Sequence, residues 1–413
     1  MTKGNYQEIY RSTPFSLRTK ALNESGRWAS WNDYIMPEVF KEDGYDDEVQ
    51  AVHHSAVIED KSPLVKYFFT GLEVIDFIDY LIPRDVTRIK ELHAVYTPIC
   101  DHEGKMVMDG LLFRLDERTF CFTAGCIDEW LKQIAERFDV VIEDKSNDFG
   151  ILHIQGPKSM DIIQQAFNND LGDLKFSRGR KLNVAGVDLH IWRQGFTGEL
   201  GFEIWVPTQD GVMVWDLLWN IGQEYGLTPF GHNSQDVARI EVGLIIPALD
   251  YTCACLNTEA KAHAYGCAES DFIASPFEFG LDRLVDLSKK DFVGKEALIT
   301  EMKNGGPENR FVGIEIDPAD IIKLYQKLNL PPEIKRRVHR FPILQIFRGG
   351  DFVGYGSSIT WSPTLKKIIG FARVKRDFSE NDANLMMEWK IKDHFSTISI
   401  SITELPFLDI KRQ

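Results

Sequence analysis

The chain has 413 residues, of which 44% are hydrophobic and 26% are charged, a composition typical of a folded globular protein with two or three domains. Lys and Arg total 47 against 62 Asp and Glu, so the formal net charge is −15 and binding to nucleic acid or to an anionic membrane is not expected. No run of about 18 apolar residues and no hydrophobic secretory segment is found, so we expect a cytoplasmic protein.

The six cysteines show no disulfide pattern, as expected in a reducing compartment. One group invites a metal interpretation, because Cys253-x-Cys255 is followed by His263 and Cys267. The spacing fits no common zinc pattern, and a C-x-C pair is poor for tetrahedral coordination. We therefore predict no metal site.

Hydrophobic periodicity predicts alternating strands and helices through the first part of the chain. In order, the expected elements are a helix with apolar positions 74, 77, 78 and 81 that Pro83 closes, strands at 96–100, 110–115 and 118–123, a helix at 127–138, a strand at 150–155 and a helix at 158–167. Because the strands and helices are interleaved, the pattern favours an α+β fold over a doubly wound α/β fold.

A polar, glycine-rich segment at 303–310, K-N-G-G-P-E-N-R, predicts a domain boundary, which we place between residues 305 and 306. Beyond it strands dominate, and we expect them at 311–316, 341–347, 368–374 and 397–403. Residues 317–328 have helical spacing and are expected as a helix inserted into this second region.

Residues 193–205 read R-Q-G-F-T-G-E-L-G-F-E-I-W and combine three glycines with Arg193, Glu199 and Glu203. Glycines at this spacing allow a tight turn and a close approach of the backbone to a flat ligand. A carboxylate two residues beyond the last glycine can accept two parallel N–H donors, as a pterin presents them. Taken alone, the pattern also fits a β-hairpin with solvated charges.

The stretch resembles the R-T-G-Y-T-G-E-x-G-F-E signature of the aminomethyltransferase family, whose founding member is the T-protein of the glycine cleavage system. Further segments resemble that family in the same order, namely Met36-Pro37, G-K-M-V-M-D at 104–109, I-Q-G-P-K at 154–158, S-P-F-E-F-G at 275–280, D-F-V-G-K at 291–295 and S-P-T-L at 362–365. The resemblance implies a three-lobed α+β cloverleaf, with two interleaved folate-binding lobes in residues 1–305. A C-terminal β-barrel with a helical insertion is implied for 306–413.

The resemblance also implies one-carbon transfer to N5 of tetrahydrofolate, and it supplies candidates for cofactor binding. Glu203 is expected to hold the pterin through its N3–H and 2-amino group. Glu199, Arg193, Arg239 and Trp361 are further candidates. Each also has a structural alternative. Glu199 can be a solvated turn residue, and Arg193 can cap a strand. Arg239 can form an internal ion pair with Asp236 or Glu241, and Trp361 can be a core side chain.

A second set of residues is expected along the transfer path. Asp109 and Tyr34 are the catalytic candidates, because a carboxylate can orient N5 or a water and a phenol can donate a proton. Tyr34, Gln235, His54 and Tyr96 are the candidates for substrate binding. Asp109 capping a turn, a packed Tyr34 and a solvated His54 are the structural alternatives.

Two departures from the family matter for the reaction. The glycine cleavage enzyme carries two adjacent aspartates where this chain has Met108-Asp109, and that pair handles aminomethyl chemistry on a lipoyl-bound substrate. We therefore expect no lipoyl carrier protein as a partner. The K-G-C-Y-x-G-Q-E string of a folate-binding branch in iron–sulfur assembly is also absent, which disfavours that branch.

Two demethylase branches resemble the chain more closely. The aromatic O-demethylases of the vanillate and syringate type are similar from Tyr96 to Phe122, in the insertion at 251–274 and in the helix at 317–328. Dimethylsulfoniopropionate demethylase is similar at 11–15, 234–235, 361–363, 367–370 and 405–407. Gln235 and Gly125 stand where the aromatic enzymes have a tyrosine and an arginine, which puts a vanillate-like substrate in doubt.

These resemblances lead to one expectation and one alternative. The expectation is a tetrahydrofolate-dependent demethylase that moves a methyl group from a small O-, S- or N-methylated substrate to N5, giving 5-methyltetrahydrofolate. The alternative is a folate-binding regulatory or assembly protein without turnover.

Overall fold

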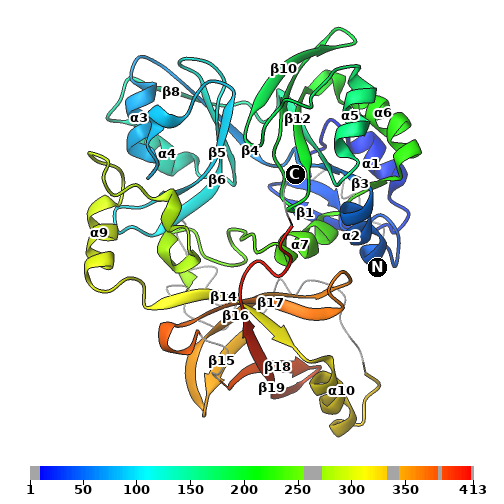
Figure 1. The fold of residues 1–413 in the computed structure, drawn as a ribbon, viewed down its shortest axis with the longest axis vertical. Coiled ribbons are helices and arrows are strands. Elements are labelled where there is room, and N and C mark those ends of the chain that lie inside the picture. The colour runs from blue at the N-terminus through cyan, green and yellow to red at the C-terminus, as the bar shows by residue number, and fades with distance from the viewer. Residues whose placement is uncertain (1–9, 255–271, 333–343, 380–383, 411–413) are drawn as a thin grey trace.

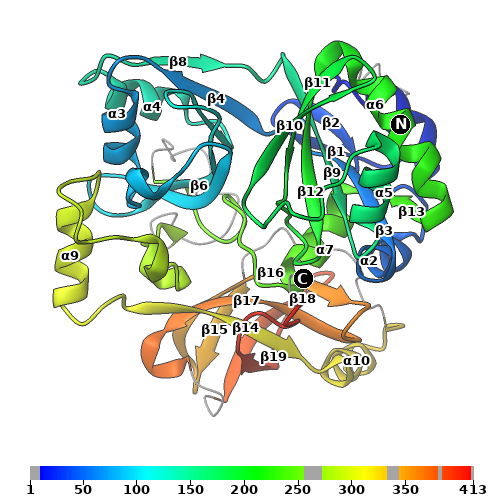
Figure 2. The same cartoon turned by 45° about the horizontal axis from the view of Figure 1, so that its top comes forward.

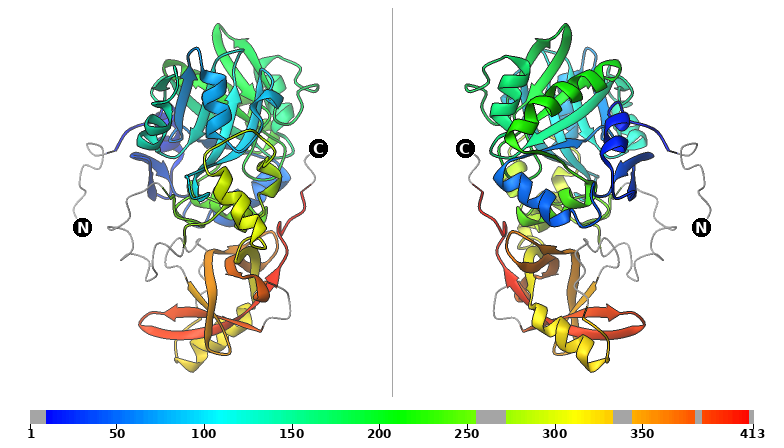
Figure 3. Two further views of the ribbon diagram at one scale, coloured as in Figure 1. Left: turned by 90° about the vertical axis from the view of Figure 1, so that its left-hand side faces the viewer. Right: turned by 90° about the vertical axis from the view of Figure 1, so that its right-hand side faces the viewer.

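The computed structural model describes residues 10–254, 272–332, 344–379 and 384–410. They form three lobes, two built on open sheets and one that is a closed barrel (Figure 1). Figure 3 shows the barrel at one end of the molecule and both sheet lobes at the other. None of the described helices is long and apolar enough to cross a membrane.

The first lobe is a five-stranded sheet in the order β5-β6-β7-β4-β8. Its strands are β4 (Val65–Thr70), β5 (His93–Cys100), β6 (Met106–Arg114), β7 (Phe120–Ala124) and β8 (Val141–Asp144). Helices α3 (Val74–Leu81) and α4 (Asp128–Ala135) belong to this lobe and bury their apolar faces in its core. In α3 the buried residues are Val74, Phe77, Ile78 and Leu81, which confirms the predicted spacing.

The second lobe is a six-stranded sheet in the order β10-β11-β12-β9-β3-β13. Its strands are β3 (Ala56–Asp60), β9 (Phe149–Gln155), β10 (Gly179–Val184), β11 (Val187–Trp192), β12 (Gly201–Pro207) and β13 (Leu227–Pro229). Helices α1 (Ser16–Leu22), α5 (Ser159–Phe167) and α6 (Gly211–Gly222) supply buried side chains to its core. A separate hairpin, β1 (Trp28–Trp31) and β2 (Tyr34–Pro37), precedes the sheet in the chain.

The two lobes are interleaved in sequence. Strands β3 and β9 pair directly, yet the whole five-stranded sheet lies between them along the chain. The chain therefore leaves the second lobe after β3, completes the first lobe and returns at β9. This arrangement gives the expected α+β fold with two interleaved lobes and places the start of β4 and the end of β8 next to the second lobe.

Strand β12 shows how alternation directs side chains toward the space between the lobes. Phe202, Ile204 and Val206 pack in the core of the second lobe, while Glu203 and Trp205 point to the opposite face. The same period places His153 of β9 opposite Glu203, because the two residues are register partners. A polar row thus lies on the face of the sheet that looks toward the other lobes.

The third lobe is a closed barrel in the order β14-β17-β16-β15-β18-β19. Its strands are β14 (Asn309–Ile316), β15 (Leu344–Arg348), β16 (Asp351–Ser362), β17 (Lys367–Lys375), β18 (Leu385–Ile391) and β19 (His394–Thr403). The inserted helix is α10 (Pro318–Lys327), whose N-cap Asp317 accepts a hydrogen bond from the Ala319 amide. The expected boundary at 305/306 lies between α9 (Lys295–Lys303) and β14, and the first residues of the strand expected at 341–347 lie outside the described residues.

Helix α7 (His232–Glu241) lies at the junction of the lobes (Figure 2). Its buried Val237 and Ile240 pack against Ile369 and Phe371 of the barrel and Val49 of α2 (Tyr45–His54). Every residue of α7 from Ser234 to Glu241 is buried. The helix is therefore enclosed on all sides, and it connects the six-stranded lobe to the barrel.

Candidate functional site

A cavity of about 1770 Å³ opens where the three lobes meet. Its walls come from β5 and β6 of the first lobe, from β12 and α7 of the second, and from β14 and the segment after β19. Pockets for drug-sized molecules are roughly 300–1,000 Å³, so this cavity has room for a large ligand together with a small one.

Glu203 lies in the wall of this cavity and is only 1% exposed. Its Oε1 accepts a hydrogen bond from Trp205 Nε1 at 2.6 Å, and its Oε2 lies 3.2 Å from His153 Nε2. Each carboxylate oxygen keeps a second lone pair, so the group can still accept two parallel donors from a ligand. The geometry fits a pterin edge with adjacent N–H donors.

His153 lies between two carboxylates on neighbouring strands. It pairs in register with Glu203 of β12 on one side and with Glu59 of β3 on the other. Glu59 in turn forms an ion pair with Lys61 at 2.8 Å, and all four side chains are buried. The sequence analysis missed His153 and Lys61, although a lone histidine in the apolar strand 149–155 was a readable signal.

Gln235 of α7 also lines the cavity, and its Oε1 accepts a hydrogen bond from Lys61 Nζ at 2.8 Å. Its buried Nε2 has no hydrogen-bond partner among the residues that the structure describes. Lys61 Nζ also lies 5.0 Å from the ring centroid of Trp31, within cation–π range. A buried amide donor without a partner beside a cavity marks a position where a ligand acceptor is stabilising.

Asp109 is the second carboxylate in the cavity wall and is 8% exposed. Its Oδ2 accepts a hydrogen bond from Tyr96 at 2.9 Å, and its Oδ1 accepts one from Tyr251. Burial raises the pKa of Asp109 to about 6, although the hydrogen bonds from Tyr251 and Tyr96 lower it. Asp109 can therefore exchange a proton near neutral pH.

The strand geometry explains the contact between Tyr96 and Asp109. In the antiparallel pair of β5 and β6, Tyr96 is opposite Leu111, so Asp109 is its diagonal neighbour on the same face. The next residue, Gly110, has no room for a side chain, because a Cβ there would lie 2.4 Å from the Thr123 carbonyl oxygen of β7. Tyr251 was not predicted as a site residue, because it follows α7 in a segment without periodicity.

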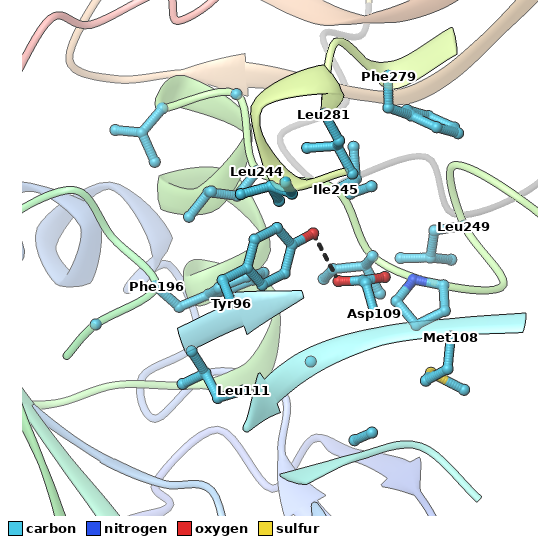
Figure 4. A pocket seen from close by; sticks show the side chains of 18 of the residues that line it. Tyr96, Met108, Asp109, Leu111, Phe196, Leu244, Ile245, Leu249, Phe279 and Leu281 are labelled. Atoms are coloured by element: carbon cyan, nitrogen blue, oxygen red, sulfur yellow. Dashed lines mark hydrogen bonds between the residues drawn. The ribbon is translucent and has the colours of Figure 1, made fainter. Parts of the chain in front are cut away.

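Apolar side chains surround Asp109 on the cavity side, as Figure 4 shows. The labelled apolar side chains of this part of the cavity are Phe196, Leu244, Ile245, Leu249, Phe279 and Leu281, while Met108 and Leu111 are drawn on the opposite side of the strands from the Tyr96–Asp109 hydrogen bond. Met108 fills the space beside Gly125, where a Cβ would lie 3.0 Å from its Cε. This end of the cavity therefore holds one buried carboxylate, which two tyrosine hydroxyls contact and apolar side chains flank.

Tyr34 is placed away from the transfer path that the sequence analysis assigned to it. It does not line the cavity, and its ring packs 4.6 Å from the guanidinium of Arg11. Burial raises the pKa of Tyr34, which makes its hydroxyl a weaker acid. This geometry corrects the expectation and favours the structural alternative of a packed tyrosine.

Glu199 and His54 are also absent from the cavity wall. Glu199 Oε1 lies 2.8 Å from His53 Nδ1, and His53 Nε2 lies 2.8 Å from Oε2 of the buried Glu241, so the histidine bridges two carboxylates at a partly buried position. Burial alone would lower the pKa of His53, but its hydrogen bonds and charge interactions with the two glutamates raise it to about 9. His54 is exposed and its Nδ1 lies 2.9 Å from the Gln50 carbonyl oxygen, so the geometry favours the solvated alternative.

Arg239 is fully buried but points away from the cavity that Gln235 lines. It forms an ion pair with Asp250 at 2.6 Å and donates to Ser358 Oγ of β16 at 2.6 Å. The contact with Ser358 connects α7 to the barrel, and Arg239 also lies 3.6 Å from Asp236, the partner named in the structural alternative, whereas Asp250 was not foreseen. Arg193 and Trp361 likewise lie outside the cavity wall, Arg193 donating to the Leu174 carbonyl oxygen and Trp361 packing against the barrel core.

The glycines of the 193–205 stretch serve a neighbouring side chain. A Cβ on Gly195 or Gly201 would lie 1.9 or 2.3 Å from the amide of Gln155, and Gly198 has φ +81°. Gln155 Nε2 donates to the Gln194 carbonyl oxygen at 3.1 Å. Two of these glycines therefore make room for Gln155, and because Gly195 also lines the cavity, the approach of a flat ligand to the backbone there stays a prediction.

No group of three or more metal-ligating side chains occurs among the described residues. Cys253 lines the cavity, whereas Cys255, His263 and Cys267 lie outside the described part of the chain. The metal interpretation of this group is therefore not examined by the structure.

Comparison with known proteins identifies the class of this fold and cavity. Residues 17–264 match the GCVT N-terminal domain and residues 337–409 match the glycine cleavage T-protein C-terminal barrel domain. The aminomethyltransferase of Alkaliphilus metalliredigens is 30% identical over 392 residues, which is 93% of this chain and 95% of that protein. The aminomethyltransferase of Thermotoga maritima is 29% identical over 341 residues, 81% and 83% of the two chains.

A solved structure shares the whole fold. The crystal structure of the glycine cleavage system aminomethyltransferase T from Bartonella henselae aligns with a TM-score of 0.77 over 97% of this chain and 99% of that chain, at 19% identity. The matched domains define a folate-dependent transferase class. The chain belongs to the aminomethyltransferase family.

Proposed function

We propose that this protein is a tetrahydrofolate-dependent demethylase that moves a methyl group from a small O-, S- or N-methylated substrate to N5. The observation that carries the proposal is the pair of buried carboxylates, Glu203 and Asp109, in one cavity, where Asp109 is hydrogen-bonded to Tyr96 and Tyr251 and otherwise flanked by apolar side chains. Glu203 would hold the pterin. Asp109 would lie at the transfer path.

The wall around Asp109 suits a methyl group better than an aminomethyl group. An aminomethyl donor carries an amine that needs hydrogen-bond acceptors or a negative charge when it is buried. Met108 precedes Asp109 in β6 and packs in the core of the first lobe, so this chain has an apolar side chain where the glycine cleavage enzyme has its first aspartate. This supports methyl transfer without a lipoyl carrier, although the relatives at 28 to 30% identity are named aminomethyltransferases.

N5 of tetrahydrofolate supplies the nucleophile when the cofactor is bound, and the protein positions the reactants and moves the proton. As the N–C bond forms, the carbon–heteroatom bond breaks and its electron pair leaves with the donor heteroatom. The proton that N5 loses can pass to Asp109, because the pKa of this carboxyl lies near 6. Tyr96 and Tyr251 keep the carboxylate oriented by one hydrogen bond to each oxygen.

The residues bear on which of two classes of methyl donor the cavity accepts, because the two leaving groups differ in their need for an acid. A sulfonium such as dimethylsulfoniopropionate leaves as a neutral thioether and needs no acid, whereas an aryl methyl ether leaves as a phenolate and benefits from a proton donor. Gln235 cannot act as that acid, which supports the sulfonium. The Trp31 and Phe196 rings lie 5.0 and 5.9 Å from Lys61 Nζ and offer flat surfaces for a planar methoxylated acid or for a methylated cation.

The test is the formation of 5-methyltetrahydrofolate from a panel of methyl donors. The panel contains a methoxylated benzoate, dimethylsulfoniopropionate and dimethylglycine, with an aminomethylated lipoyl carrier protein as a fourth arm. We expect product from one of the first three and none from the carrier. Product from the carrier alone would replace demethylation by aminomethyl transfer.

Two variants connect product formation to the cavity. Glu203→Gln should weaken binding of 5-methyltetrahydrofolate about 10- to 100-fold, because a charge-assisted bidentate pair becomes a mixed amide contact. Glu143→Gln, on exposed β8, is the matched control and should bind like the wild type. Folate affinity lost in Glu203→Gln, without product from any donor, would support the alternative of a non-catalytic folate-binding protein.

A further inference from the structure

His153 is the middle member of a row of polar side chains that crosses three neighbouring strands of the second lobe. It is the register partner of Glu203 in β12 and of Glu59 in β3. Its neighbours along β9, Leu152 and Ile154, pack in the core of the lobe, so His153 points to the opposite face and lines the cavity. Glu59 does not line the cavity, so it can affect a ligand there only indirectly.

Two buried atoms of this row, Nδ1 of His153 and Oε2 of Glu59, have no hydrogen-bond partner among the residues that the structure describes. The two residues are directly opposite each other, and such pairs have Cβ atoms about 4.5–5.5 Å apart, so a small rotation of either side chain brings the atoms together. Nε2 of His153 lies 3.2 Å from Oε2 of Glu203 and donates to it, because an ionised carboxylate only accepts. Nδ1 can satisfy Glu59 only if it carries a proton too. The two open positions are therefore complementary when the imidazole is doubly protonated.

The buried charges along this row balance when His153 is positive. Three carboxylates and two ammonium groups, none of them more than 4% exposed, belong to the network: Glu59, Asp60, Glu203, Lys61 and Lys66. Lys61 forms its ion pair with Glu59 at 2.8 Å, and Lys66 interacts electrostatically with Glu203. A net negative charge is costly in the interior, so one further positive charge is stabilising. The imidazole supplies it, because an imidazole binds a proton more tightly than a carboxylate does.

The other titratable groups packed near this row leave the balance as it is. Burial raises the pKa of Cys121 in β7, which keeps that thiol neutral. Burial lowers the pKa of Lys66 to about 8, so this ammonium group is still charged at pH 7. Asp144, which also interacts with Lys66, is exposed to solvent. On α7, Asp236 lies 3.6 Å from Arg239.

We propose that His153 is a positioning residue of the pterin site: as a protonated imidazole between Glu59 and Glu203, it orients the Glu203 carboxylate and neutralises its charge. The proposal rests on the proposed function, in which Glu203 holds the pterin. The N3–H and 2-amino edge of a pterin is neutral, whereas a buried carboxylate without a counter-charge would favour a cation. The imidazole therefore makes Glu203 selective for a neutral pair of N–H donors. Glu59 keeps the imidazole protonated.

The charge of His153 is measured by NMR of the full chain labelled with ¹⁵N-histidine, and His153→Gln assigns its signals. We expect a proton on both ring nitrogens at pH 7.5. Glu59→Gln, which keeps the shape of the side chain, should move the titration of His153 to lower pH by at least about one unit, because an opposite charge is removed. His190→Gln is the matched control on strand β11 of the same sheet. Burial lowers the pKa of His190 to about 4, so this variant removes a neutral ring and should leave the titration of His153 unchanged.

Calorimetry with 5-methyltetrahydrofolate tests whether His153 acts through Glu203. His153→Leu should weaken binding about 10- to 100-fold, whereas His153→Gln, whose amide can still donate to Glu203, should weaken it only about 3- to 10-fold. In the Glu203→Gln background, His153→Leu should cause no further loss, because the contact that it supports is already gone. Urea unfolding of each variant checks that it is folded under the conditions of the titration.

The outcomes separate this role from the proposed function. A neutral imidazole at pH 7.5 in a chain that binds 5-methyltetrahydrofolate would overturn the role of His153 and keep the folate site. It would also mean that Glu59 is satisfied in another way. Additive losses in the double variant would overturn the role too, since His153 would then act without Glu203. No binding of 5-methyltetrahydrofolate by the wild type would overturn the proposed function, and the role of His153 with it.

Discussion

Tyr251 and Asp109 are joined by a hydrogen bond that connects the segment after α7 to strand β6 of the first lobe. Tyr251 is 1% exposed and Asp109 8%, so the contact is shielded from water. The contact bridges elements that are more than 140 residues apart in the chain. The carboxylate that we place at the transfer path is therefore oriented both by its own sheet and by the segment that follows α7.

The first prediction concerns this hydrogen bond. Tyr251→Phe removes a donor that lowers the pKa of Asp109, so this pKa should rise above its value of about 6. The carboxylate form is lost as pH falls through that pKa. The acidic limb of the pH profile of kcat/KM should therefore shift to higher pH by about one unit. A pH profile of product formation measures the shift. Tyr225→Phe, whose hydroxyl bonds Gln165 in the second lobe, is the control. A uniform loss at every pH, with an unmoved limb, would mean that Tyr251 only supports packing.

The second prediction is a pH dependence of stability that comes from His53. Its pKa is about 9 in the folded chain and about 6.5 when unfolded, so the folded state binds more protons between these values. The stabilisation is fully present below pH 6.5 and is lost as pH rises through about 9. At about 1.4 kcal/mol per pKa unit it amounts to roughly 3 kcal/mol.

Urea unfolding of the wild type and of His53→Gln at pH 6 and pH 9.5 checks this value. The stability difference between the two proteins should shrink by most of those roughly 3 kcal/mol at the higher pH. His54→Gln, the exposed neighbour on the same helix, should show no such change. A difference that is the same at both pH values would show that the row of Glu199, His53 and Glu241 does not hold a charged histidine.

The third prediction concerns the ion pair between α7 and the segment that follows it. Arg239 and Asp250 are both fully buried at 2.6 Å, and removing one partner leaves the other as an uncompensated charge. Arg239→Met should therefore cost about 3–5 kcal/mol in the free energy of unfolding. Arg180→Met is the control, because its partner Asp173 is 75% exposed and such a pair contributes less than about 1 kcal/mol. Chemical denaturation that gave equal losses for both would contradict the structural role of Arg239.

Much of the architecture was predictable because strand and helix periods are local. The apolar spacing of α3 and the alternation of β12 follow from neighbouring residues, and that alternation is enough to turn Glu203 away from the apolar core. The resemblance placed Asp109 in the same region. Both carboxylates do line the cavity, although their roles stay predictions.

The rest depended on contacts between distant segments. Helical spacing put Gln235 and Arg239 on one face, but the long arginine side chain turns to Asp250, which only the folded loop after α7 brings near. Tyr251 acquires its role from β6, more than 140 residues earlier. The partners of His53 come from two other segments as well, so its raised pKa could not be read from its own helix.

The last prediction concerns the glycines that gave the sequence its most recognisable stretch. A Cβ on Gly201 would lie 2.3 Å from Gln155 Nε2, so Gly201→Ala should destabilise the chain by about 1–3 kcal/mol through overpacking. Gln155→Ala should cost stability by itself, because the Gln194 carbonyl oxygen loses its donor. If the glycine is kept only to make room for this amide, the double variant should be more stable than the sum of the two single losses implies. Gly172→Ala, at an exposed site whose Cβ would meet only Asp170 Oδ1 at 3.2 Å, is the control. Additive losses in thermal unfolding would instead show that Gly201 is required by some contact other than Gln155.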